Sequence, residues 1–108
     1  MAIKTRSQIF SERAWNELSK ANLTDEFVTR ARSFPALIHN AGACQAWAFC
    51  LSKDKLDGAY PRILKAVAGE DFANLKNVKL FQYMLLSECM MEAAQWIKTT
   101  VDALKPEV

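Results

Sequence analysis

Residues 36–51 constrain the fold more than any other part of this chain. On a helical wheel the segment has apolar residues on every side, and its few polar residues point in different directions. A helix that is apolar all round is buried on most of its sides. Ser33 is suited to cap such a helix, and Pro35 would fall in its first turn, where the missing N–H of proline costs nothing. The pattern predicts a central core helix at about residues 34–53.

Apolar spacing predicts further helices around this one. In the first of them Phe10, Ala14 and Leu18 recur every four residues and form one stripe. Thr24 is a suitable N-cap for the second, because acidic residues follow it in the first turn. These helices are expected at about residues 6–21, 25–32, 61–68 and 79–104, with a loop near residues 68–71 and room for some helix within residues 69–77.

Turn-forming residues are scarce, with three glycines and three prolines among 108 residues. An all-β fold needs many turns, so this scarcity favours long helices joined by few loops. The hydrophobic fraction of 51% and the charged fraction of 24% are ordinary for a globular domain and argue against disorder. We therefore expect an all-α fold, a compact single-domain helical bundle of about four to six helices spanning residues 1–108.

Residues that support enzyme or metal chemistry are few. His39 is the only histidine, and the three cysteines, Cys44, Cys50 and Cys89, lack the spacing of a metal site or a disulfide framework. We expect no metal, no other cofactor and no catalysis, with cysteines that act as small buried hydrophobes in a reducing cytoplasm. The alternative of a cysteine-dependent enzyme would need a thiol of low pKa beside His39.

Membrane segments are not expected either. The chain starts without an apolar targeting stretch, and residues 36–51 are too short and too interrupted to cross a bilayer.

Positive charge concentrates in the middle of the chain. Residues 30–65 carry six basic and two acidic side chains, although the whole protein has a net charge of only +2. The basic residues are Arg30, Arg32, Lys53, Lys55, Arg62 and Lys65. Two interpretations stay open, scattered solvated charge or a surface that binds phosphates without sequence preference and with strong salt dependence.

The segment 31–53 resembles the hallmark segment of the small helical subunit of the type III-B CRISPR Cmr complex, an RNA-guided RNA-silencing machine. The matching positions are Pro35, Leu37, Ile38, Asn40, Gly42, Gln45, Ala46, Ala48, Phe49, Leu51 and Lys53. Arg13-Ala14-Trp15 is similar to the start of the family's first helix. The stretch from Tyr83 to Trp96-Ile97-Lys98 is similar to its last helix.

The resemblance implies a subunit that is not a nuclease. Such subunits stack head to tail with copies of themselves, contact other Cmr subunits, and help line a positive channel that holds guide RNA and target RNA. Base pairing would then select the sequence, while the protein reads charge and shape. By position, the candidates for RNA phosphate contacts are Arg13, Arg30, Arg32, Lys53, Lys55, Arg62 and Lys65.

A second function class is a helical adaptor that binds only protein. It would present an exposed apolar patch with Trp or Met, and its binding would survive high salt.

Overall fold

The computed structural model describes residues 4–105 except residues 55–57. Helices dominate this part of the chain, and none of its residues lies in a strand. The elements are α1 (Arg6–Lys20), α2 (Asp25–Ala41), α3 (Ala43–Asp54), α4 (Ala59–Ala68), the short 3₁₀ helix η1 (Phe72–Asn74) and α5 (Leu80–Leu104). The prediction of an all-α helical bundle is confirmed.

Helix α1 is specified by its cap and its apolar stripe. Thr5 and Gln8 form a reciprocal capping box, in which the Gln8 N–H donates to Thr5 Oγ1 at 3.2 Å and the Thr5 N–H donates to Gln8 Oε1 at 2.8 Å. Phe10, Ala14 and Leu18 are the buried residues of the helix. The predicted bounds of 6–21 are therefore confirmed to within one residue.

The prediction of one central helix at residues 34–53 is wrong, because two helices meet within that segment. Helix α2 begins after its N-cap Thr24, as predicted, but runs on to Ala41 instead of ending at residue 32. The chain then turns at Gly42, whose φ of 88° and ψ of 159° are accessible to almost no other residue, and α3 begins at once.

Ser33 and Pro35 lie inside α2, and Ser33 is not an N-cap. Its hydroxyl donates to the Arg30 carbonyl of the same helix at 3.4 Å. Proline inside a helix normally costs about 3 kcal/mol, because it removes one hydrogen bond and crowds the preceding turn. The buried stripe of α2 crosses the proline, with Phe34 and Ile38 on either side of it. We infer that this packing offsets the local cost.

Helix α3 is less buried than its sequence suggests. Ala43, Ala46, Trp47 and Cys50 are buried, whereas Phe49 keeps 42% of its surface exposed. The most enclosed helix is instead α4, which contacts α1, α2, α3 and α5. Six of its ten residues are buried, so the core is organised around α4, and the prediction that residues 34–53 are its central element is corrected.

Aromatic side chains join α4 and η1 to the α2–α3 layer. The Tyr60 ring lies between two rings of α2, with centroids 5.5 Å from Phe27 and 5.1 Å from Phe34. Trp47 of α3 meets Phe72 of η1 edge to face at 5.3 Å. The helix expected within residues 69–77 is thus present as η1, and its buried phenylalanine completes the core.

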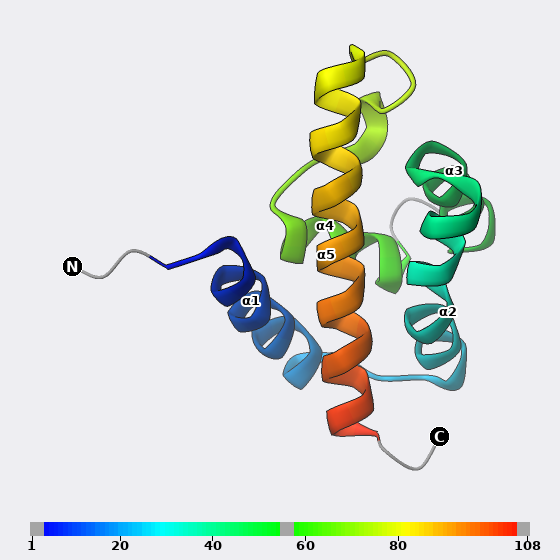
Figure 1. Ribbon diagram of the computed structural model, residues 1–108. Helices are drawn as coiled ribbons and strands as arrows, with labels where there is room; N and C mark the ends of the chain where they lie inside the picture. Colours follow the sequence, from blue (N-terminus) through cyan, green and yellow to red (C-terminus); the bar gives the residue numbers. More distant parts are fainter. Residues whose placement is uncertain (1–3, 55–57, 106–108) are drawn as a thin grey trace.

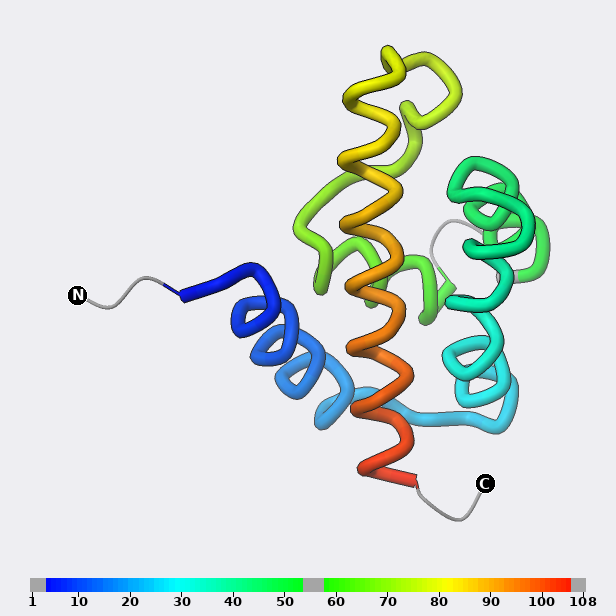
Figure 2. The backbone as a smooth tube through the Cα atoms, in the orientation of Figure 1, coloured from blue at the N-terminus to red at the C-terminus, as the bar shows by residue number. Residues whose placement is uncertain are grey.

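Helix α5 spans the length of the molecule. It packs over α4, with α1 along one flank and α2 and α3 along the other (Figures 1 and 2). Met90, Ala93, Ile97 and Val101 are buried, and the helix agrees with the predicted bounds of 79–104 to within one residue. The first turns of α5 extend beyond the ends of the other helices (Figure 1).

Candidate RNA-contacting surface

Two candidate cations meet over one exposed aromatic ring. The guanidinium carbon of Arg30, on α2, lies 5.1 Å from the Phe49 ring centroid, and Lys53 Nζ lies 5.8 Å from the same centroid. Phe49 and Lys53 are four residues apart on α3, so their side chains share a face of that helix. Cations within about 6 Å of a ring centroid are attracted to the ring. We name Arg30, Phe49 and Lys53 the cation–aromatic cluster.

A shallow groove runs beside this cluster. Asp25, Glu26 and Thr29 of α2 line it together with Arg30 and Lys53, and its volume is about 420 Å³. The two carboxylates occupy the first turn of α2, where the helix dipole favours negative charge. The groove therefore has mixed charge, with Arg30 and Lys53 beside the acidic first turn of α2.

Arg32 points away from the cation–aromatic cluster. Its Nε donates to Asp102 Oδ1 at 2.8 Å, and its Nη2 donates to the Lys105 carbonyl at 2.9 Å. Lys105 Nζ in turn donates to the Leu23 carbonyl at 2.9 Å. These contacts tie the end of α5 to α2 and to the segment before it, so Arg32 has a structural role in addition to its candidate RNA role.

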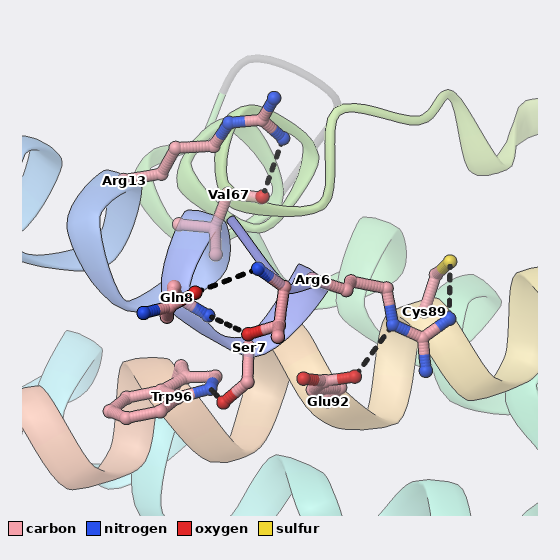
Figure 3. Close-up of polar contacts among 9 residues, drawn as sticks. Arg6, Ser7, Gln8, Arg13, Val67, Cys89, Glu92 and Trp96 are labelled. Carbon is pink, nitrogen blue, oxygen red and sulfur yellow. Dashed lines mark hydrogen bonds and ion pairs between the residues drawn. The ribbon is translucent and has the colours of Figure 1, made fainter. Parts of the chain in front are cut away.

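Arg13 also has a structural partner. Its Nη1 donates to the Val67 carbonyl at 3.1 Å, so the guanidinium lies at the C-terminal end of α4, where the helix dipole favours positive charge (Figure 3). Gly69 follows with φ 69° and ends α4 in the left-handed conformation. A Cβ at Gly69 would stand 2.6 Å from Arg13 Nη1, so the glycine makes room for the arginine.

The remaining candidates do not join the cluster through a contact of the described residues. Arg62 and Lys65 lie on α4, the first exposed and the second half-buried. Lys55 lies outside the described residues. The structure thus brings Arg30 and Lys53 together and gives Arg13 and Arg32 other partners, while the assignment of all seven to RNA stays a prediction.

Phe49 is the residue of this surface that sequence reasoning missed. The apolar wheel of residues 36–51 assigned it to the core, whereas 42% of its surface is exposed. Its spacing of four residues from Lys53 was the available signal. No signal in the sequence indicated that Arg30 approaches Phe49, because this contact depends on how the chain turns at Gly42 between α2 and α3.

A second polar cluster joins α1 to α5 (Figure 3). Arg6 Nε pairs with Glu92 Oε1 at 2.7 Å, and the Trp96 indole N–H donates to the Ser7 hydroxyl at 3.2 Å. The half-buried Glu92 is thus ion-paired, whereas Glu88, one turn earlier, is exposed. Both glutamates line a groove of about 580 Å³ between the two helices. Glu92 is therefore held against α1 by its ion pair with Arg6.

Cys89 does not have the environment of a nucleophile. Burial raises the pKa of its thiol, and this effect outweighs the nearby Arg6 guanidinium, whose Nη1 lies 3.6 Å from Sγ. A reactive cysteine needs the opposite shift, so this site argues against the cysteine-enzyme alternative. Within the described ranges, no three potential His, Cys, Asp or Glu ligands are grouped to hold a metal ion. In the same ranges, no helix is both long and apolar enough to span a bilayer.

Comparisons with known proteins agree with this architecture. The family described as "CRISPR-associated protein (Cas_Cmr5)" matches residues 6–104, nearly the whole chain. The chain belongs to this Cmr5 family. A curated Cmr5 relative, "CRISPR system Cmr subunit Cmr5" of Thermus thermophilus, is 32% identical over 114 aligned positions, which cover 97% of this chain and 100% of the relative.

The fold of the Cmr5 family is known from a crystal structure. A CRISPR-associated Cmr5 family protein from Thermus thermophilus superimposes with a TM-score of 0.83 at 29% identity. The superposition covers 94% of this chain and 98% of that protein. The resemblance noted from residues 31–53 is therefore confirmed, and this Cmr5-family chain is a subunit of a CRISPR Cmr complex.

Proposed function

We propose that this chain is a non-catalytic small subunit of a type III-B Cmr complex, which helps line the channel for guide and target RNA and scaffolds the assembly. The observation that carries the RNA role is the cation–aromatic cluster. Arg30 and Lys53 reach one exposed ring from two different helices, so the α2–α3 packing fixes their separation.

Such a cluster is suited to contact an RNA backbone. Lysine and arginine attract phosphates through charge, and this interaction weakens steeply as salt increases because bound counterions are released. Phe49 offers part of an exposed ring face on which an unpaired base can stack. Recognition of this kind reads charge and shape, and leaves sequence choice to base pairing between the two RNA strands.

The other candidates supply weaker support. Arg62 is exposed on α4 and is suited to a further phosphate contact. Arg13 and Arg32 would have to contact RNA while keeping their partners in α4 and α5. We accordingly rank Lys53 and Arg30 first. We also propose that the subunit stacks on copies of itself, contacts other Cmr subunits and works in the cytoplasm.

A protein-only adaptor is the second candidate function. It is favoured by an exposed apolar surface at the start of α5, where Phe81 keeps 72% of its surface exposed. Adaptor binding through such a surface would survive high salt, whereas phosphate binding would not.

The test uses the reconstituted complex and its affinity for target RNA across a salt series. Lys53→Glu should weaken binding and lower the salt slope by about one unit, the value expected for one lost phosphate contact. Phe49→Ala should weaken binding at every salt concentration without changing that slope. Lys53 and Phe49 are exposed, so both variants should keep the far-UV circular dichroism of the parent.

Lys20→Glu is the matched control, because Lys20 is an exposed lysine near the end of α1 and is not a candidate. It should leave both affinity and slope unchanged. If Lys53→Glu and Lys20→Glu behave alike, the cation–aromatic cluster does not bind RNA. If neither Lys53→Glu nor Lys20→Glu affects RNA capture, and assembly of the complex persists in high salt, the adaptor function is supported instead.

A further inference from the structure

Two grooves follow each other along one side of α5. The first is the groove of about 580 Å³ between α1 and α5 described above. The second, of about 320 Å³, lies between the start of α5 and the segment of residues 70–78 that precedes it. We name the two grooves together the α5 groove. Residues of α5 that line it recur at helical spacing and share one side of the helix: Leu85, Glu88, Glu92, Trp96 and Thr99.

Apolar side chains line the α5 groove along its length. Leu85 and Leu86 line the second groove, and Met91 and Trp96 line the first. Leu86, Met91 and Trp96 are half-buried against the core, so part of each side chain stays open to a partner. The Trp96 indole is also held in place, because its N–H donates to the Ser7 hydroxyl (Figure 3).

The charges that line the α5 groove are mostly negative. Glu70 and Asp71 line the second groove. Glu88 and Glu92 line the first, together with Arg6, which is paired with Glu92 at 2.7 Å. These four carboxylates and one guanidinium give the described lining a net charge of −3, whereas the whole chain has a net charge of +2. Such a groove repels the phosphates of RNA and attracts a cationic partner.

The α5 groove lies away from the candidate RNA surface. Helix α1, which lines the first groove, runs along one flank of α5 (Figures 1 and 2). Helices α2 and α3, which carry the cation–aromatic cluster, run along the other flank. The molecule thus separates a cationic surface from an acidic groove, so that one can contact RNA while the other holds a protein segment.

We propose that the α5 groove is the docking site for an amphipathic helix of another Cmr subunit, one whose apolar stripe is flanked by lysine or arginine. The proposal rests on the contacts with other Cmr subunits proposed above, and it is independent of the RNA role. A helix that lays its apolar face in a groove is a common mode of recognition. Leu85 and Thr99 are 14 residues apart, so the groove follows α5 for about 21 Å, the length of a helix of about four turns.

A second copy of this chain is a poor occupant of the α5 groove. Helix α4 carries Arg62 and Lys65 beside an apolar stripe, which is the required pattern. Six of its ten residues are nevertheless buried in the core of its own molecule, so α4 could enter a groove on another copy only if the bundle opened. The occupant is therefore assigned to a different subunit.

Titration of the free ¹⁵N-labelled protein with a model peptide tests the chemistry of the groove. The probe is an amphipathic helix of leucine and lysine, about 14 residues long, and the control peptide has glutamate in place of every lysine. The indole N–H resonance of Trp96 should shift with the lysine probe and not with the glutamate peptide. The resonances of the buried Trp47 and of Trp15, which is exposed on α1 and lines neither groove, should stay in place with both peptides.

A charge reversal tests the acidic lining. Glu88→Lys should weaken binding of the lysine probe at least about fivefold, because an attraction becomes a repulsion. Glu17→Lys is the matched control, since Glu17 is an acidic residue of α1 that lines neither groove. It should bind the probe like the parent. Far-UV circular dichroism checks that both variants are folded.

Site-specific crosslinking in the reconstituted Cmr complex identifies the occupant. A photoreactive benzoylphenylalanine in place of Gln95, which is exposed and lines the first groove, should crosslink to a lysine- or arginine-containing segment of another subunit. The same replacement at Gln45, an exposed glutamine of α3 on the other flank, is the control and should not crosslink to that segment. Glu88→Lys should also lower incorporation of the chain into the complex, whereas Glu17→Lys should not.

The possible failures can be told apart. No shift of Trp96 with the lysine probe, or an equal shift of Trp15, would overturn the assigned chemistry. A crosslink from position 95 to RNA or to a second copy of this chain would overturn the assigned occupant. If the parent chain enters the complex but position 95 crosslinks to no other subunit, the docking site is wrong while the proposed subunit contacts stand. If the parent chain does not enter the complex, those contacts are wrong and the docking site with them.

Discussion

Replacing Gly69 by alanine should destabilise the protein by two separable effects. The first is backbone strain, because a left-handed residue with a Cβ costs about 1–2 kcal/mol. Part of this cost is offset by the smaller entropy of the unfolded chain, about 0.4–1 kcal/mol for a Gly→Ala change. The second effect is local, because the new Cβ would lie 2.6 Å from Arg13 Nη1.

Movement of the Arg13 guanidinium would relieve this close contact, but it would also break the hydrogen bond that the guanidinium donates. Arg13 would lose its 3.1 Å hydrogen bond to the Val67 carbonyl, which is partly buried. A hydrogen bond from a charged group contributes about 1.5 kcal/mol or more when buried, and we take about 1 kcal/mol for this partly exposed one. Together the effects predict a loss of about 2 kcal/mol in the free energy of unfolding for Gly69→Ala.

Urea denaturation of four proteins separates the effects: the parent, Gly69→Ala, Arg13→Ala and the double variant. In the Arg13→Ala background only the strain remains, so the cost of Gly69→Ala should fall to about 1 kcal/mol. In a domain of roughly this size each kcal/mol changes the Tm by about 4–8 °C, which gives an independent readout.

Gly42→Ala is the matched comparison, because that glycine also has a positive φ but its Cβ would meet only Tyr83 Oη at an ordinary 3.5 Å. Its cost should be about 2–3 kcal/mol, entirely from backbone strain, and Arg13→Ala should leave it unchanged. If the cost of Gly69→Ala is the same with and without Arg13, the reasoning about the arginine contact is refuted.

Two further predictions concern α5. Tyr83→Phe should lower the free energy of unfolding by about 0.5–1.5 kcal/mol in thermal denaturation, because the Cys44 N–H at the start of α3 donates to the Tyr83 hydroxyl at 3.2 Å; no loss would mean that water replaces the hydroxyl without cost. Cys89 should react with iodoacetamide more slowly than a free cysteine at neutral pH, and its labelling profile should move to higher pH, because a raised pKa lowers the thiolate fraction at any given pH. Labelling as fast as an exposed model thiol would contradict the buried environment.

The sequence predicted best where local signals act alone. The bounds of α1 and α5 follow from apolar stripes that continue over several turns, and Thr24 is the N-cap of α2 as expected. The prediction failed between α2 and α3, because two local signals competed. Ser33 and Pro35 have the composition of a helix start, whereas the actual break needs the positive φ that only Gly42 supplies.

The candidate site was less predictable than the fold for a physical reason. Basic residues are visible in the sequence, but their partners are set by packing across long separations. Arg32 meets Asp102 from 70 residues away, and Arg13 meets Val67 from 54. Composition could not tell these arginines from Arg30, which lies over an aromatic ring instead. The reversal of Arg32 is consequently a poor probe of RNA binding, since it also removes a link between α2 and α5.

The corner at Gly42 has a consequence for how this surface can vary. One residue alone separates α2 from α3, and each residue of an α-helix turns the chain by about 100°. An insertion or deletion of one residue at the corner would therefore rotate Phe49 and Lys53 by more than a quarter turn around α3, away from Arg30. It would also turn Trp47 away from Phe72 and out of the core. The corner must therefore keep its length for the cation–aromatic cluster to exist at all.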